Sequence, residues 1–228
     1  MTMNGIGTLQ ESSLHAALKN WYIRPEDVLE TRVDGYWIDI VRGEELIEIQ
    51  TRNFSAIRRK LERLVQEHPI RLVYPIAVEK FILRVANISE KRISRRKSPK
   101  RGNAIDLFHE LVRIPHLVKD PNFTLEIVYI QEEVVWQDDG LGSWRRKGWS
   151  LIDHRLITVV SRQEFHSAQD YASLLPASLP VPFTVRELAE KLGHSVPLAR
   201  RMAYSLRKMG MLEFVGKRKG AYLYRIIH

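Results

Sequence analysis

Residues 33–50, VDGYWIDIVRGEELIEIQ, are the stretch that most constrains the fold of this chain. Apolar and polar residues alternate there at period two, which predicts two strands joined by a tight turn. We expect Val41 to pair with Leu46 across that turn, a register that places Asp39 directly opposite Glu48. Facing carboxylates repel, and like charges at this spacing destabilise a sheet. A divalent cation held by oxygen ligands would offset the repulsion, so the stretch predicts a metal site.

A helix is predicted over residues 10–22, with Leu14 and Leu18 on its apolar stripe. Glu11 lies on the same stripe, where an acid facing the core side needs a partner. One interpretation is an N-terminal glutamate favoured by the helix dipole. The other is that Glu11 is a third acidic ligand that reaches the strand pair.

The chain after Gln50 predicts a crossover between two strands. Asn53 or Ser55 can cap a helix that runs to about residue 67, and residues 70–76 form a continuous apolar run typical of a buried strand. Strand, helix and strand in this order predict a right-handed parallel crossover. A further strand is expected over residues 80–85. The first predicted domain, residues 1–88, is therefore a small mixed α/β sheet with flanking helices.

This order of elements resembles the PD-(D/E)xK nuclease superfamily, which has the restriction-endonuclease-like fold. Asp39 matches the first acid of its motif, Glu48 matches the second, and Gln50 stands where most members have lysine. Glu11 matches the helix glutamate that many members carry. The segment also looks like an uncharacterised bacterial family of such domains. The resemblance covers about residues 8–85 and implies a Mg²⁺ or Mn²⁺ ion held by the three acids.

The chemistry that this resemblance implies is phosphodiester hydrolysis. Mg²⁺ bound by Asp39 and Glu48 would neutralise charge on the phosphate and activate a water molecule. Gln50 can orient a water molecule, but it is neither a cation nor a general base. Lys60, on the following helix, is the candidate replacement for the missing lysine. Alternatively, Asp39 and Glu48 are ordinary positions on an exposed sheet face.

The charge of the chain favours a polyanionic partner. Lys and Arg number 36 against 27 acids, a net charge of +9, and nucleic acid is the commonest partner of such a protein. An anionic membrane surface is the alternative, but the sequence lacks a basic amphipathic helix with a strong apolar face. Cysteine is absent, which excludes disulfides, thiolate metal sites and a cysteine nucleophile. With no secretory signal or membrane-spanning run apparent, a cytoplasmic protein is expected.

A basic run, KRISRRKSPKR, occupies residues 91–101 and begins a predicted middle segment, residues 89–166. Such runs are usually flexible and solvated, and they either contact phosphates or serve as solubilising linkers. We expect salt-sensitive phosphate contacts that do not depend on base sequence. The predicted nucleic-acid-binding residues of this run are Lys91, Arg92, Arg95, Arg96, Lys97, Lys100 and Arg101.

The middle segment continues with a predicted helix over residues 105–118, which Pro115 is expected to kink or end, and with strands over residues 123–136 and 150–160. A basic and aromatic tip over residues 144–149 joins the two strands, and it suits either base stacking or packing beneath a hairpin. The pattern does not assign residues 105–160 to a fold.

The last predicted domain, residues 167–228, resembles a winged helix-turn-helix. Thr184 and Glu187 form a capping box for one helix, which Gly193 ends, and Ser195 caps a second helix that runs to Met209. A hairpin with a basic tip follows. In this resemblance the second helix enters the major groove and the wing contacts the DNA backbone or minor groove. The implied DNA-binding residues are Arg200, Arg201, Arg207, Lys217, Arg218 and Lys219.

These observations lead to one expected function and two alternatives. The expected function is a metal-dependent DNA nuclease delivered to DNA by its winged helix, and a homodimer would be required to cut both strands, since one such site cuts one strand. The first alternative is a non-catalytic DNA-binding protein or regulator with a degenerate nuclease fold. The second is a winged helix that docks a partner protein. The sequence does not distinguish DNA from RNA.

Overall fold

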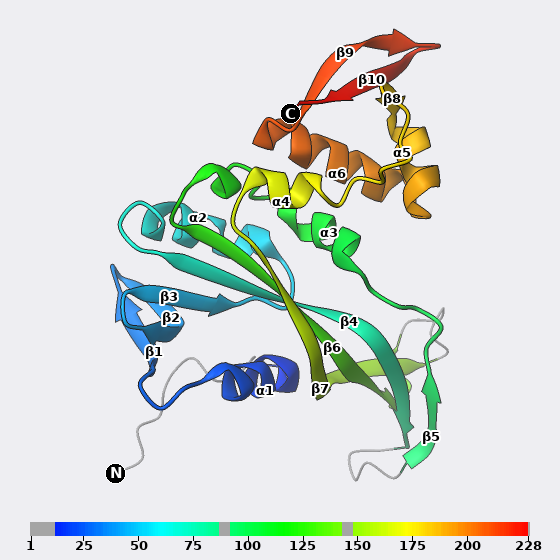
Figure 1. The fold of residues 1–228 in the computed structure, drawn as a ribbon. Helices are drawn as coiled ribbons and strands as arrows, with labels where there is room; N and C mark the ends of the chain where they lie inside the picture. Colours follow the sequence, from blue (N-terminus) through cyan, green and yellow to red (C-terminus); the bar gives the residue numbers. More distant parts are fainter. Residues whose placement is uncertain (1–11, 87–91, 143–147, 228) are drawn as a thin grey trace. The chain divides into compact units, whose positions relative to one another are not determined.

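The structure, a computed structural model, describes residues 12–86, 92–142 and 148–227, which form a mixed α/β arrangement (Figure 1). The described α-helices are α1 (Ser13–Tyr22), α2 (Phe54–Leu64), α3 (Phe108–Leu111), α4 (Ala168–Ala172), α5 (Val185–Leu192) and α6 (Val196–Met209). The described strands are β1 (Val28–Val33), β2 (Tyr36–Arg42), β3 (Glu45–Ile49), β4 (Ile70–Val85), β5 (Arg92–Lys97), β6 (Phe123–Asp138), β7 (Trp149–Phe165), β8 (Phe183–Thr184), β9 (Leu212–Arg218) and β10 (Ala221–Ile226). The mixed sheet with flanking helices predicted from the sequence is confirmed.

The described strands form two sheets. The larger has seven strands in the order β1-β2-β3-β4-β6-β7, with β5 paired to β4, and the smaller has three strands in the order β8-β10-β9. None of the helices in the described ranges is long and apolar enough to cross a membrane.

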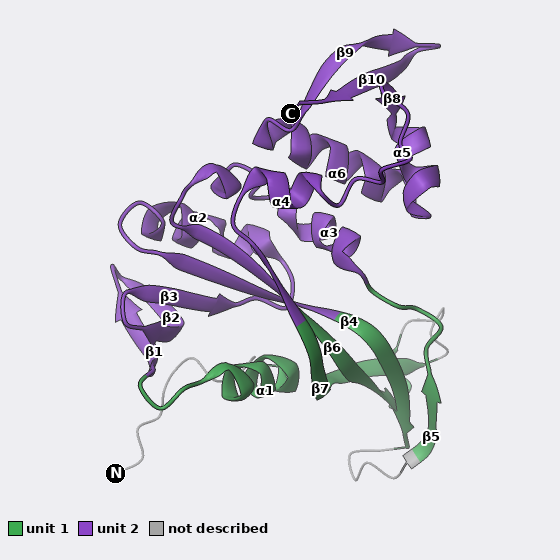
Figure 2. Ribbon diagram, viewed as in Figure 1, with its two compact units in different colours: residues 1–26, 77–102, 128–161 green, residues 27–76, 103–127, 162–228 purple. Residues whose placement is uncertain are grey.

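The chain divides into two compact units, each built from three separate stretches (Figure 2). Unit 1 comprises residues 1–26, 77–102 and 128–161, and unit 2 comprises residues 27–76, 103–127 and 162–228. The units do not coincide with the consecutive ranges 1–88, 89–166 and 167–228. They interleave because β4, β6 and β7 are long strands that each contribute residues to both units.

The sheet of unit 2 begins with a hairpin that the sequence analysis did not predict. Val33 ends β1 rather than starting β2, and it pairs with Tyr36 across the turn. Asp34 and Gly35 form that turn with φ of 47° and 86°. An Asp-Gly pair with positive φ at both residues is the usual connection of a two-residue hairpin. The strand predicted to start at Val33 is therefore wrong at its first three residues.

The next hairpin has the register that the sequence predicts. Val41 pairs with Leu46 and Ile40 with Ile47 in antiparallel β2 and β3. Strand β3 then pairs in parallel with β4, where Leu46 is level with Ile70, and α2 lies in the connection. The predicted parallel crossover is confirmed.

The start of α2 is capped by a distant residue. Asn53 occupies the N-cap position, but it has φ of 59° and its side chain makes no capping hydrogen bond. The Phe54 N–H instead donates to Glu110 Oε2 at 3.0 Å. Phe54 is fully buried, and its ring meets Tyr74 of β4 edge-on with centroids 5.1 Å apart. The predicted local cap is replaced by a contact between segments far apart in sequence.

Strand β4 in the structure joins two strands that the sequence predicts separately, over residues 70–76 and 80–85. Its second half pairs with β5 in antiparallel fashion, with Phe81 opposite Lys97. The basic run is expected to be flexible and solvated, but its residues 92–97 form strand β5. The guanidinium of Arg95 lies 4.1 Å from the Phe81 ring centroid, so the basic side chains cover apolar surface.

The helix predicted over residues 105–118 is shorter than expected, because α3 ends at Leu111, before the kink or end predicted at Pro115. A 3₁₀ turn (Ala104–Leu107) leads into α3, and a second 3₁₀ turn (Leu117–Lys119) follows. Pro115 lies between them, and proline cannot donate the hydrogen bond that a continuous helix requires. The segment therefore turns rather than extends.

The last part of unit 2 agrees closely with the sequence analysis. The side chain of Thr184 accepts from the Glu187 N–H in a capping box at the start of α5, and Gly193 ends that helix with φ of 65°. Helix α6 follows, with Ser195 at its N-cap position. Strands β9 and β10 form a hairpin whose turn is Lys219-Gly220, which is shorter than the predicted loop because β9 continues to Arg218.

Candidate active site

Asp39 and Glu48 lie on adjacent strands of unit 2. The register of β2 and β3 pairs Ile40 with Ile47, and one further step brings Asp39 level with Glu48 on the same face of the sheet. Asp39 Oδ2 accepts a hydrogen bond from the Ile49 N–H at 2.9 Å. This bond holds the Asp39 carboxylate against β3.

Lys60 extends from α2 to the same face. Its Nζ lies 2.6 Å from Glu48 Oε2 and also donates to the carbonyl oxygen of Trp37. Glu48 is only 8% exposed, and a buried carboxylate needs a charge partner. The ammonium group therefore supplies part of the compensation for which the sequence analysis invoked a metal ion.

Gln50 faces the loop that leads from β3 into α2. Its amide nitrogen donates to the carbonyl oxygens of Arg52 and Asn53, the latter at 3.5 Å. Its backbone N–H donates to the Val73 carbonyl oxygen at 2.9 Å. Gln50 thus holds the loop between β3 and α2 in place. That loop leads into α2, the helix that carries Lys60. The water-orienting role expected for Gln50 stays a prediction.

The chemistry of these side chains fits a hard divalent cation. Mg²⁺ binds one or two carboxylates, retains several waters and takes further oxygens from a substrate phosphate. Asp39 and Glu48 provide two carboxylates, while Glu11 lies outside the described residues. Within the described ranges no group of three or more His, Cys, Asp or Glu side chains could hold a metal ion. A metal here would share Glu48 with the Lys60 ammonium group.

Trp37 is an exposed aromatic residue on the same strand face as Asp39. It precedes Asp39 by two positions on β2 and is 66% exposed. Arg32 of β1 is its cross-strand partner, and Arg32 Nε donates to the Gly35 carbonyl oxygen at 3.2 Å. A ring beside a guanidinium suits contact with a nucleobase and a phosphate. The sequence pattern assigned Trp37 no role.

Two cations of the basic run have acidic partners within unit 1. Arg95 Nε lies 2.6 Å from Glu133 Oε1, and Lys97 Nζ lies 2.5 Å from Glu79 Oε1. The first pair links β5 to β6 and the second links β5 to β4. The two side chains therefore form ion pairs between strands of the sheet. Arg96, Lys100 and Arg101 are exposed as well, and they form no ion pair with an acid of the described ranges. Lys91 and the side chain of Arg92 lie outside the described residues.

The C-terminal cations also include some that bond to other side chains and some that form no ion pair with a described acid. Arg201 of α6 donates to His109 Nδ1 at 2.9 Å, and Arg218 pairs with Glu187 of α5. Both side chains join elements of unit 2. The predicted DNA-binding residues that are exposed there and form no ion pair with an acid of the described ranges are Arg200, Arg207, Lys217 and Lys219.

Residues 12–166 match the family described as "Domain of unknown function (DUF8091)". The chain belongs to this family. The matched span contains Asp39, Glu48 and Lys60, and it ends directly before Ser167, the N-cap of α4. A Treponema pallidum (strain Nichols) protein described as "Uncharacterized protein" is 31% identical over 221 residues, which cover 96% of this chain and 87% of that protein. No solved structure matches the chain.

Proposed function

We propose that this chain is a Mg²⁺- or Mn²⁺-dependent DNA nuclease with a restriction-endonuclease-like core. The observation that supports it best is the convergence of Asp39, Glu48 and Lys60 from β2, β3 and α2. Two adjacent acids and an ammonium group are the residue types of the PD-(D/E)xK motif. Gln50 occupies the position of the motif lysine, and Lys60 would perform the role of that lysine in its place.

The residues of the site have distinct parts in the proposed reaction. A bound Mg²⁺ ion would neutralise phosphate charge and supply an activated water. The hydrogen bond from Ile49 preorganises Asp39 as a ligand, as hydrogen bonds to metal-binding carboxylates generally do. The ammonium group of Lys60 can donate to a phosphate oxygen or orient a water molecule beside Glu48. Trp37 and Arg32 would contact the nucleic acid that flanks the cleaved bond.

Delivery to DNA is assigned to the C-terminal elements, which we interpret as a winged helix-turn-helix. Helices α5 and α6 and the β9–β10 hairpin follow one another in the order of that motif, and exposed Arg200, Arg207 and Lys217 provide positive charge. The protein would act in the cytoplasm, and cutting both strands with one site per chain would require a homodimer. RNA is the alternative substrate for the same chemistry.

A non-catalytic DNA-binding protein is the second candidate. The observation that favours it is the ion pair of Glu48 with Lys60, which balances the charge of a buried carboxylate by a side chain of the protein itself. In that case the core would be a degenerate nuclease fold, and the C-terminal helices and hairpin would perform the function.

Cleavage assays separate the two candidates. Plasmid and labelled oligonucleotides are incubated with Mg²⁺ or Mn²⁺ and with wild type, Asp39→Ala, Glu48→Ala or Glu44→Ala. Glu44 is an exposed acid in the β2–β3 turn and controls for the loss of one negative charge. We expect cleavage by wild type and Glu44→Ala only. Equal cleavage by all four proteins refutes the proposed site, and DNA binding without cleavage under either metal selects the second candidate.

A further inference from the structure

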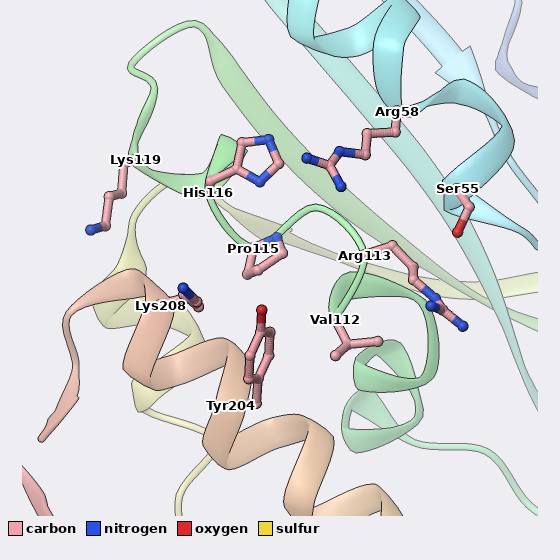
Figure 3. A pocket seen from close by; sticks show the side chains of 9 residues that line it. All are labelled: Ser55, Arg58, Val112, Arg113, Pro115, His116, Lys119, Tyr204 and Lys208. Carbon is pink, nitrogen blue, oxygen red and sulfur yellow. The ribbon is translucent and has the colours of Figure 1, made fainter. Parts of the chain in front are cut away.

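A pocket of about 560 Å³ opens in unit 2, lined by the start of α2, the segment that follows α3, and α6 (Figure 3). Small-ligand sites typically measure roughly 300–1,000 Å³. Nine residues line this pocket, and none of the nine is acidic. Asp39, Glu48 and Lys60 are not among them, so the pocket is distinct from the proposed active site.

The lining of the pocket is strongly positive. Its four cationic side chains are Arg58, Arg113, Lys119 and Lys208. Glu62 offsets the charge of Arg58, and a bound anion would offset the charges of the other three. Arginine suits phosphate in particular, because its planar guanidinium donates two parallel hydrogen bonds. The pocket therefore fits a ligand with concentrated negative charge.

Glu62 of α2 orients two of the lining residues. Its Oε1 accepts a hydrogen bond from Arg58 Nε at 2.7 Å and lies 2.7 Å from His116 Nε2. The bond from Arg58 lowers the pKa of Glu62, burial opposes it, and the bond from His116 lowers the pKa further. The side chains of Arg58 and His116 extend toward each other in Figure 3. Arg58 is held through Nε, so its two terminal nitrogens remain donors for a ligand.

Tyr204 gives the pocket an aromatic surface. It projects from α6, is 43% exposed, and has Lys208 Nζ 5.8 Å from its ring centroid. Its hydroxyl points toward the loop that carries Pro115 (Figure 3). An exposed ring among cations is the arrangement that stacks on a nucleobase while the cations contact phosphate.

We propose that this pocket binds a nucleoside phosphate, with the phosphate on Arg58 and the neighbouring cations and the base against Tyr204. The same chemistry has two sources, a free nucleotide and the phosphorylated terminal nucleotide of a nucleic-acid strand. An acidic peptide would use the cations without needing the ring, which makes Tyr204 the discriminating residue. The site does not depend on the proposed nuclease chemistry.

Fluorescence anisotropy of the full chain tests the proposal, in EDTA so that no strand is cleaved. The probe is a 3′-labelled single-stranded oligonucleotide with a 5′-phosphate, compared with the same strand ending in a 5′-hydroxyl. A strand-end site binds the phosphorylated strand about tenfold more tightly, since charge-assisted hydrogen bonds to phosphate are strong. A free-nucleotide site does not distinguish the two strands, and instead binds fluorescently labelled ATP, which unlabelled ATP displaces. The proposal is overturned if neither result is found, or if inorganic phosphate competes as well as ATP.

Substitutions identify the pocket as the place of binding. Tyr204→Ala is expected to weaken binding about tenfold, whereas Tyr204→Phe retains the ring and binds as wild type does. Arg58→Gln should also weaken binding about tenfold. The control is Lys191→Gln on α5, which removes the same charge outside the pocket. Binding is measured in EDTA, where no metal-dependent cleavage takes place, so this proposal and the nuclease proposal can fail separately. Unchanged binding by folded Tyr204→Ala and Arg58→Gln would overturn the assignment.

Discussion

Lys60 Nζ and Glu48 Oε2 lie 2.6 Å apart, although twelve positions of sequence and a loop separate the two residues. Glu48 stands on β3 and Lys60 on α2, so the strand–helix step of the parallel crossover brings the charges together. The same ammonium group donates to the Trp37 carbonyl oxygen of β2. One side chain therefore joins both strands of the central hairpin to the helix that follows them.

Replacing Lys60 should lower the rate of DNA cleavage more than it lowers the affinity for DNA. Lys60→Met is expected to lower cleavage at least about 100-fold, as the loss of one preorganised donor does in other active sites. DNA affinity should stay close to that of wild type, and Lys60→Arg should restore part of the cleavage. Single-turnover cleavage and anisotropy measure the two effects. Full cleavage by Lys60→Met, with the variant folded, would show that the ammonium group is structural only.

Metal binding should be detectable without any substrate. A ligand at 100 times its dissociation constant stabilises a protein by about 2.7 kcal/mol. We expect Mn²⁺ to raise the melting temperature of wild type and Glu44→Ala, and EDTA to reverse the change. Asp39→Ala should show no Mn²⁺-dependent rise. A rise of the same size in Asp39→Ala would place the metal elsewhere.

The salt dependence of DNA binding should separate exposed cations from paired ones. Removing a cation that binds one phosphate reduces the slope of log affinity against log salt by about 1. Arg200→Ala and Arg207→Ala, which change exposed residues of α6, are expected to show that reduction. Lys97→Ala should change the slope less, because Lys97 pairs with Glu79 at 2.5 Å. A larger change in slope for Lys97→Ala than for the two α6 variants would indicate that β5 forms the DNA-binding surface.

Arg71 should be among the residues that contribute most to the stability of unit 2. Its guanidinium lies 2.9 Å from carboxylate oxygens of Glu45, Glu126 and Glu164, and Glu126 is 0% exposed. Arg71→Met removes the nearer cationic partner of Glu126 and leaves Arg162 Nη1 3.6 Å from its Oε1. We therefore expect a loss below the ~3–5 kcal/mol that a fully unpaired buried carboxylate costs. Urea unfolding measures the loss, and adding Glu126→Gln should recover part of it. No recovery in the double variant would mean that the loss comes from packing.

Glu132 should make the stability of unit 1 depend on pH. It is buried on β6, with Oε1 2.5 Å from Lys80 Nζ and Oε2 3.4 Å from His154 Nδ1. Burial raises its pKa, but the hydrogen bonds from His154 and Lys80 outweigh burial, so the pKa of Glu132 ends below its ordinary value. A carboxyl group with a lowered folded pKa stabilises the fold above its unfolded pKa and loses that contribution as pH falls through the folded value.

Lys80→Met tests this dependence. The substitution removes one of the two hydrogen bonds that lower the pKa of Glu132, so the variant should lose stability near neutral pH and lose less on acidification. Urea unfolding of wild type and variant from neutral to acidic pH measures the difference, which should narrow below the ordinary glutamate pKa. A difference that is constant over this range would mean that Lys80 acts through packing rather than charge.

Features set by neighbouring residues could be predicted from the sequence. The β2–β3 register follows from period-two alternation around a short turn, and the start and end of α5 follow from Thr184, Glu187 and Gly193. The Asp34-Gly35 turn is an equally local signal, but it falls inside a stretch whose alternation predicts a strand. Predicted boundaries are wrong where two local patterns overlap.

The sequence by itself determined the local elements and the face on which Asp39 and Glu48 lie, because alternation, turn residues and caps act over a few positions. Only the tertiary structure decided that Lys60 pairs with Glu48, that Glu110 caps α2, and that Arg58 and Tyr204 line one pocket. Those contacts join segments 12 or more positions apart, and for Glu110 and Phe54 the separation is 56. They depend on how helices cross strands, which residue periodicity does not encode.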